Sequence, residues 1–237
     1  MALIGVRSVL GIENEKGSPF NVQRSVHIPN LTYEEVEGMF KWYEKEYYLK
    51  FSSPFVQKRI FNYFSRRYFN YLGQLIHPLD AMEDAVDKEN LYIPNIIKRY
   101  QAYLTKNQGI FFKDVPRRKD DLRIYEAIYH FNLYRYLYDL LKSWDIDVVP
   151  HFPTGNGKID LILKYKGKIY ALELKSFKNM NMHEKGIEQA AEYGRQMGLK
   201  EVALLVFVEL TLAEAKQLEK VVDKKGINVT VLPVGIL

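Results

Sequence analysis

Apolar residues recur at helical spacing between residues 122 and 143, and short apolar runs separated by polar turns follow them. The pattern predicts a helix over 122–143, strands over 146–152, 158–165 and 168–175, a helix over 184–197, a strand over 202–208, a helix over 211–225 and a strand over 227–232. The run over 202–208 is wholly apolar, which indicates a buried strand. This order is typical of an α/β domain with a mixed β-sheet flanked by helices.

The chain before residue 122 has a different pattern. Residues 1–31 show little periodicity, whereas Thr32 and Glu35 have the spacing of a capping box and predict a helix to about residue 49. Residues 32–110 are expected to be mostly helical, with one helix over 91–104 that carries Pro94 in its first turn. The charged stretch 115–121 predicts a boundary. We therefore expect an N-terminal extension over 1–50, a helical region over 51–115 and an α/β domain over 116–237.

Aromatic residues crowd the stretch 40–72, where Lys58, Arg59, Arg66 and Arg67 lie between them. One interpretation is a helical core of aromatic side chains with basic outer faces. The other is a surface on which nucleic-acid bases stack and arginines pair with phosphates. The first interpretation is favoured, because aromatic residues at helical spacing usually pack inside a protein.

The composition excludes some classes of function but does not identify one. The 237 residues are 47% hydrophobic and 27% charged, carry a formal net charge of +5 and contain no cysteine. The absence of cysteine excludes disulfides, thiolate metal sites and cysteine nucleophiles, and fits a reducing, cytoplasmic compartment. The mild positive charge permits a nucleic-acid partner without requiring one. No apolar run approaches the roughly 18–20 residues of a membrane helix, and we expect no signal peptide at the start.

The residues that could bind a metal or take part in catalysis lie on the hairpin predicted over 158–175. If Lys166 and Gly167 form a two-residue turn, Asp160 lies directly opposite Glu173 on the paired strand. Lys175 is two residues beyond Glu173 and therefore shares its face. Facing carboxylates repel unless a cation lies between them, and oxygen ligands suit Mg²⁺ or Mn²⁺. A salt-bridge cluster on an exposed hairpin is the alternative.

The order of these pieces resembles the PD-(D/E)xK nuclease superfamily. The resemblance rests on Asp160 in Gly157-Lys-Ile-Asp, on Glu173-Leu-Lys175, and on the helices predicted before and after them. The next helix carries Gln189-Ala-Ala-Glu-Tyr193, which is similar to the Gln-x-x-x-Tyr box of the RecB-like branch. Ile159 stands where the superfamily name has proline. The resemblance covers about residues 122–208.

The resemblance implies roles for single residues. Asp160, Glu173 and Lys175 would be catalytic, with the metal held by Asp160, Glu173, the backbone carbonyl of Leu174 and Glu126 of the preceding helix. Gln189 and Tyr193 would flank the metal and touch the DNA backbone. Further candidates carry less support from the sequence. They are His130, His151 and His183 as ligands, and Lys178, Lys185 and Arg195 as phosphate contacts.

The start of the chain resembles the late part of the ATPase domain in prokaryotic AAA-like ATPases. The matching pieces are Ala2-Leu-Ile-Gly-Val-Arg7, Ser18-Pro-Phe-Asn-Val22 and Leu31-Thr-Tyr-Glu-Glu-Val36. The chain contains no G-x-x-x-x-G-K-[ST] phosphate loop, so ATP hydrolysis is not expected.

Two functions remain open at this point. The first is a Mg²⁺- or Mn²⁺-dependent deoxyribonuclease that hydrolyses phosphodiester bonds. The second is a non-catalytic nuclease-like module that binds nucleic acid or an ATPase partner. A homodimer is compatible with either.

Overall fold

The computed structural model describes residues 54–70, 72, 81–153 and 157–236. The expectations for residues 1–53, including the ATPase-like segments, lie outside these residues, and the predicted domain division stays a prediction. The first helices are α2 (Pro54–Tyr68), α3 (Ile93–Phe111) and α4 (Glu126–Leu141), followed by the 3₁₀ turn η2 (Lys142–Trp144). Pro94 lies in the first turn of α3, as its spacing predicts.

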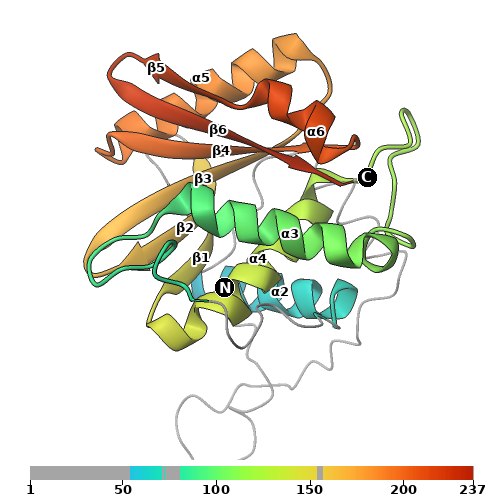
Figure 1. Cartoon of the computed structure of the whole chain (residues 1–237), viewed down its shortest axis with the longest axis horizontal. Helices are drawn as coiled ribbons and strands as arrows, with labels where there is room; N and C mark the ends of the chain where they lie inside the picture. Colours follow the sequence, from blue (N-terminus) through green and yellow to red (C-terminus); the bar gives the residue numbers. More distant parts are fainter. Residues whose placement is uncertain (1–53, 71, 73–80, 154–156, 237) are drawn as a thin grey trace, which may run out of the picture. The chain divides into compact units, whose positions relative to one another are not determined.

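Six strands and two further helices complete the chain (Figure 1). In order they are β1 (Asp147–Pro153), β2 (Lys158–Tyr165), β3 (Lys168–Ser176), α5 (Met180–Gln196), β4 (Glu201–Val208), α6 (Leu212–Ala215), the 3₁₀ turn η3 (Lys216–Leu218), β5 (Lys220–Lys224) and β6 (Ile227–Gly235). The strands form one sheet in the order β1-β2-β3-β4-β6-β5. The pairs β3–β4 and β4–β6 are parallel and the other three are antiparallel. The predicted α/β class with a mixed sheet is confirmed.

Strand β4 is apolar because both of its neighbours are parallel strands and both of its faces are covered. Val206 belongs to the core beneath α5, and α5 packs against β3, β4 and β6. The next residue, Phe207, stacks on Tyr129 of α4 with ring centroids 4.5 Å apart. Successive strand residues point to opposite faces, so α4 and α5 cover opposite faces of the sheet (Figure 1).

The aromatic residues of α2 that the structure describes mostly face inward. Phe61 and Phe64 are buried, and both rings pack against Phe131 of α4. Tyr63 is exposed, and Arg66 and Arg67 lie on the outer side. The core interpretation therefore holds for this part of the stretch.

The helix predicted over 211–225 is wrong. Only Leu212–Ala215 and the short turn Lys216–Leu218 are helical, and Lys220–Lys224 pair with β6 as a strand. Lys225 and Gly226 both have positive φ, 57° and 82°, as a two-residue hairpin turn requires. The glycine is therefore a hairpin turn residue, and the β-branched pair Val221 and Val222 belongs to a strand.

Two helix starts also differ from the predicted ones. Helix α5 begins at Met180 rather than 184, because the Asn179 side chain accepts a hydrogen bond from the Met182 amide and caps the helix. Helix α4 begins at Glu126 rather than 122, since Leu122 has a φ of 56° that no right-handed helix contains. None of the helices in the described ranges is long and apolar enough to cross a membrane.

Gly194 offers a test of how closely α5 packs on the sheet. A methyl group at this position would lie 2.7 Å from Val202 Cγ2 and 2.9 Å from Ile227 Cγ2. Gly194→Ala should therefore lower the free energy of unfolding by about 1–3 kcal/mol in urea denaturation. The matched control is Gly109→Ala in α3, where a methyl meets nothing within 4 Å. This substitution should raise the free energy of unfolding by up to about 0.5–1 kcal/mol. Equal effects of the two substitutions would contradict this packing.

Candidate active site

The site is built on the hairpin of β2 and β3. Tyr165 pairs with Lys168, and the register continues to Leu161 opposite Leu172. Lys166 and Gly167 have φ of 48° and 77°, so the predicted two-residue turn is confirmed. The same register places Asp160 opposite Glu173, one step beyond the last paired residues. There Asp160 Oδ2 accepts a hydrogen bond from the Leu174 amide at 2.8 Å.

Glu173 is the most deeply buried carboxylate of the group, with 1% of its surface exposed. Its Oε1 accepts a hydrogen bond from Lys175 Nζ at 2.7 Å, whereas the buried Oε2 has no hydrogen-bond partner among the described residues. Burial and the negative charge of Asp160 raise the pKa of Glu173 well above its ordinary value, and the Lys175 ammonium opposes this shift. Burial and Asp160 therefore disfavour the charged form of Glu173, and Lys175 favours it.

Lys175 supplies the positive charge that the carboxylates share. Its Nζ lies 2.7 Å from Glu173 Oε1 and 3.9 Å from Glu126 Oε1. Burial alone would lower the pKa of Lys175, but attraction to Glu173, Glu126 and Asp160 outweighs it and raises that pKa well above its ordinary value. Lys175 is therefore a cation at neutral pH.

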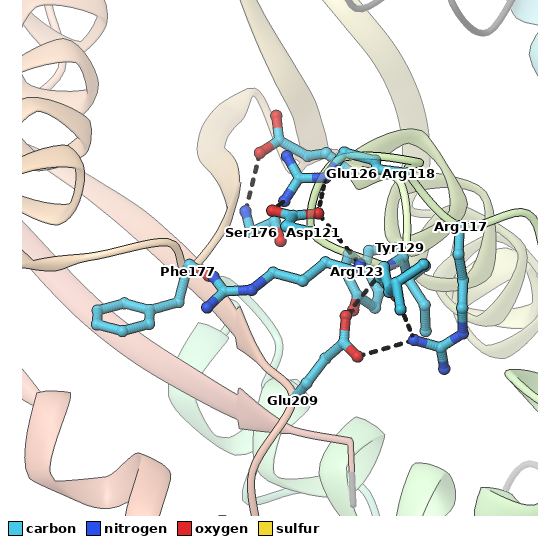
Figure 2. Close-up of polar contacts among 11 residues, drawn as sticks. Arg117, Arg118, Asp121, Arg123, Glu126, Tyr129, Ser176, Phe177 and Glu209 are labelled. Atoms are coloured by element: carbon cyan, nitrogen blue, oxygen red, sulfur yellow. Dashed lines mark hydrogen bonds and ion pairs between the residues drawn. The ribbon is translucent and has the colours of Figure 1, made fainter.

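Glu126 is the first residue of α4, where the positive end of the helix dipole favours a carboxylate. Its Oε2 accepts a hydrogen bond from the Ser176 amide at 2.8 Å, as Figure 2 shows. This contact fastens the start of α4 to the end of β3, immediately after Lys175. Ser176 takes part through its backbone, so its residue type gave no signal in the sequence.

His130 lies one helical turn after Glu126 and is 97% buried. Its Nε2 is 3.5 Å from Asp160 Oδ2. The sequence gave His130 less weight than the carboxylates, yet the fold places it against the central aspartate.

Gln189 and Tyr193 are four residues apart on α5 and contact each other, since Gln189 Nε2 donates to Tyr193 Oη at 2.8 Å. Burial raises the pKa of Tyr193, the hydrogen bond from Gln189 lowers it, and the charge of Glu173 raises it further. The phenol is thus within electrostatic reach of Glu173. The contacts of Gln189 and Tyr193 with a metal and with DNA stay predictions.

The Tyr193 ring is seated against Gly157, which precedes β2. A methyl on Gly157 would lie 2.8 Å from both Cε1 and Oη of Tyr193. Gly157→Ala should displace the ring and lower the free energy of unfolding by about 1–2 kcal/mol. In a Tyr193→Ala background, Gly157→Ala should leave the free energy of unfolding unchanged. Thermal denaturation of the wild type, the two single variants and the double variant therefore forms a double-mutant cycle. The same cost in both backgrounds would show that Gly157 acts elsewhere.

The fit of a divalent cation can be judged from the donors. Asp160 and Glu173 offer carboxylate oxygens, and Glu173 Oε2 is buried without a hydrogen-bond partner in the described structure. These two residues fit a hard cation such as Mg²⁺ or Mn²⁺. Glu126 is engaged by Ser176 and Lys175, and the described ranges hold no group of three or more His, Asp or Glu side chains placed to bind one ion. Ligation by Glu126 and by the Leu174 carbonyl therefore stays a prediction.

The remaining candidates are scattered. His183 is buried in the first turn of α5, and its ring nitrogens have no hydrogen-bond partner within the described chain. Arg195 forms an ion pair with Glu192 on its own helix, whereas Lys178 and Lys185 are exposed. The His151 side chain lies outside the described residues.

The sequence did not single out the residues that attach the segment before α4 to the strand ends. Glu209, just after β4, accepts hydrogen bonds from Arg117 Nη1 at 3.0 Å and from the Ile124 amide at 2.8 Å. Arg123 donates to the carbonyl of Phe177, just after β3 (Figure 2). Such contacts join residues far apart in sequence and leave no local pattern.

Comparison with known proteins gives little. No family model matches the chain, and no curated protein matches it. A search of solved structures finds a protein described as a type III CRISPR defence DNA nuclease activated by cyclic oligoadenylate. The match has 14% sequence identity and a TM-score of 0.31, and covers 60% of this chain and 21% of that one. A likeness this weak carries no argument about function, and the chain spans about a fifth of the nuclease.

Proposed function

We propose that this chain is a metal-dependent nuclease of the PD-(D/E)xK type that hydrolyses DNA phosphodiester bonds. The observation that carries the proposal is the placing of Asp160, Glu173 and Lys175 at the end of one hairpin, with the Lys175 ammonium 2.7 Å from Glu173. Two acids and a partly buried amine on neighbouring strands are groups that can bind a divalent cation and stabilise negative charge on a phosphate. The fold supports the proposal, because a helix bearing Glu126 precedes the hairpin and one bearing Gln189 and Tyr193 follows it.

Asp160 and Glu173 would hold the divalent cation, Mg²⁺ or Mn²⁺. When bound, such an ion polarises the scissile phosphate and lowers the pKa of a water molecule. Lys175 would hold the attacking water in place and donate to the phosphate oxygen on which negative charge develops. His130 would keep the Asp160 carboxylate in one orientation. Gln189 and Tyr193 would contact the DNA backbone beside the cleaved bond.

One arrangement favours a second function. Lys175 already neutralises Glu173, and the described residues hold no three-ligand cluster, so the site could persist without metal. The chain would then be a non-catalytic module that binds nucleic acid or an ATPase partner. Its DNA binding would weaken with salt and would be unaffected by Glu173→Ala.

A cleavage screen separates the two functions. Single-stranded, duplex and branched DNA would be incubated with the protein in Mn²⁺, with EDTA as the control. The nuclease predicts cleavage in Mn²⁺ and none in EDTA. Intact DNA of all three kinds, with a folded protein by circular dichroism, would contradict the nuclease and leave the binding module.

A further inference from the structure

The start of α4 is not fixed by a cap of its own. Tyr125 occupies the N-cap position, and its side chain makes no capping hydrogen bond. Glu126, the first helical residue, nevertheless lies beside Lys175 with its side chain 31% exposed. Its carboxylate is attracted by Lys175 and repelled by the charge of Glu173. These opposing charges do not determine where the helix begins, so contacts with other elements have to fix it.

Glu209, which follows β4, contacts the chain on both sides of Glu126 (Figure 2). Its Oε1 accepts a hydrogen bond from the Ile124 amide at 2.8 Å and one from Tyr129 Oη at 3.4 Å. Ile124 lies two residues before Glu126, and Tyr129 lies three residues after it. One carboxylate oxygen therefore joins the segment before α4 (residues 117–125) to the first turn of the helix.

The two donors that Glu209 binds are buried. Ile124 is wholly buried, and without the carboxylate its amide would lose its acceptor, which is unfavourable in the interior. Tyr129 is also wholly buried, and its ring stacks on Phe207 of β4. Burial and the charge of Glu209 raise the pKa of Tyr129 above its ordinary value, so the phenol stays a neutral donor. Glu209 therefore has a defined place in the packing around the start of α4.

A closed circuit of contacts connects Glu209 to the end of β3. Arg123, in the segment before α4, donates to the carbonyl of Phe177 (Figure 2). The Phe177 amide in turn donates to the Phe207 carbonyl at 2.9 Å, which joins the end of β3 to β4. Phe207 lies two residues before Glu209. The segment before α4 is therefore attached to the ends of both strands, one of which carries Lys175.

We propose that Glu209 is a positioning residue, which acts through the segment before α4 to hold Glu126 beside Lys175. Its contribution to catalysis rests on the proposed function, whereas its effect on the position of Glu126 does not. Without the Glu209 carboxylate, the start of α4 would separate from the end of β3. The hydrogen bond that Glu126 accepts from the Ser176 amide would then open more often.

Amide hydrogen exchange, measured by NMR on the full chain in EDTA, tests the proposal without any need for activity. The Ser176 amide reports on its contact with Glu126, and the Leu174 amide, which donates to Asp160, reports on the hairpin itself. Glu209→Ala should speed exchange at Ser176 at least about tenfold, because the buried Ile124 amide loses its acceptor. Exchange at Leu174 should stay unchanged.

Further variants separate the hydrogen bond from the mere presence of a side chain. Glu209→Gln keeps an oxygen that can accept from the Ile124 amide, so exchange at Ser176 should stay within about threefold of wild type. The matched control is Glu201→Ala, which removes an exposed glutamate at the other end of β4 and should leave exchange at Ser176 unchanged. Should Glu209→Ala not fold, Glu209→Asp, whose side chain is one methylene shorter, should speed exchange at Ser176 in the same way.

Each result decides the proposal. Unchanged exchange at Ser176 in Glu209→Ala, equal acceleration at Ser176 and Leu174, or exchange in Glu209→Gln as fast as in Glu209→Ala would overturn it. Selective acceleration at Ser176 supports it even if the cleavage screen in Mn²⁺ finds no nuclease activity. If wild type cuts DNA, Glu209→Ala should lower kcat at least about tenfold and leave KM for DNA within about threefold. An unchanged kcat in that variant would overturn the role of Glu209 in catalysis.

Discussion

Asp160→Asn should weaken Mn²⁺ binding at least about 100-fold, since even the residues behind metal ligands typically change affinity 10–100-fold. Asparagine keeps the shape of aspartate and can still accept the hydrogen bond from the Leu174 amide, which Asp160 Oδ2 accepts at 2.8 Å in the native protein. The fold should therefore survive while the ligand charge is lost. Isothermal titration calorimetry with Mn²⁺ measures the change.

The matched control for this substitution is Asp145→Asn. Asp145 is exposed and has a φ of 57°, a conformation that asparagine also adopts readily. Its replacement should leave Mn²⁺ affinity unchanged. Equal Mn²⁺ affinity in the wild-type and Asp160→Asn proteins would show that the cation does not bind at Asp160.

Lys175→Met should lower the free energy of unfolding by about 3 kcal/mol near neutral pH, because it leaves the buried Glu173 without its cation. Exposed Lys178 is the matched control, and Lys178→Met should change stability by less than about 0.5 kcal/mol. Adding Glu173→Gln to Lys175→Met should recover most of the loss, since the buried charge is then gone. Urea denaturation of the single and double variants measures these energies.

The loss in Lys175→Met should grow with pH. The pKa of Glu173 is raised above its ordinary value of 4.5, and Lys175 is one of the charges that lower it. Without Lys175 the folded protein therefore holds the Glu173 proton more tightly than the unfolded chain does. Stability is then retained below about pH 4.5 and falls as the pH rises toward the folded pKa. An equal loss at pH 5 and pH 8, or no recovery in the double variant, would contradict the buried pair.

Much of the fold follows from local pattern. The hairpin register could be predicted because Lys166-Gly167 permits a two-residue turn, which pairs Tyr165 with Lys168 and fixes every pair beyond it. The helix over 211–225 failed because a glycine with positive φ ends helices and closes hairpins equally well, so Gly226 alone could not decide. The pair Val221 and Val222 favoured the strand, and pairing with β6 settled it.

The candidate site could also be predicted only in part from the sequence. Asp160, Glu173 and Lys175 could be placed together because a hairpin fixes their faces, and Gln189 and Tyr193 because a helix does. Contacts across the fold could not be predicted. Arg123 reaches a carbonyl 54 residues away, and Arg117 reaches Glu209 over 92 residues. His130 could be expected on the face of Glu126, but its approach to Asp160 depends on how α4 packs against the sheet.

The rate of DNA cleavage by Glu173→Gln tests the central claim most directly. Glutamine fills the same buried space, and its amide oxygen can accept the hydrogen bond that Lys175 now donates to Glu173. The variant should fold with the circular dichroism of wild type. We predict that wild type cuts DNA in Mn²⁺ and that Glu173→Gln cuts it at least about 100-fold more slowly, as expected when an essential charged group is removed. Cleavage by Glu173→Gln at the wild-type rate would contradict it.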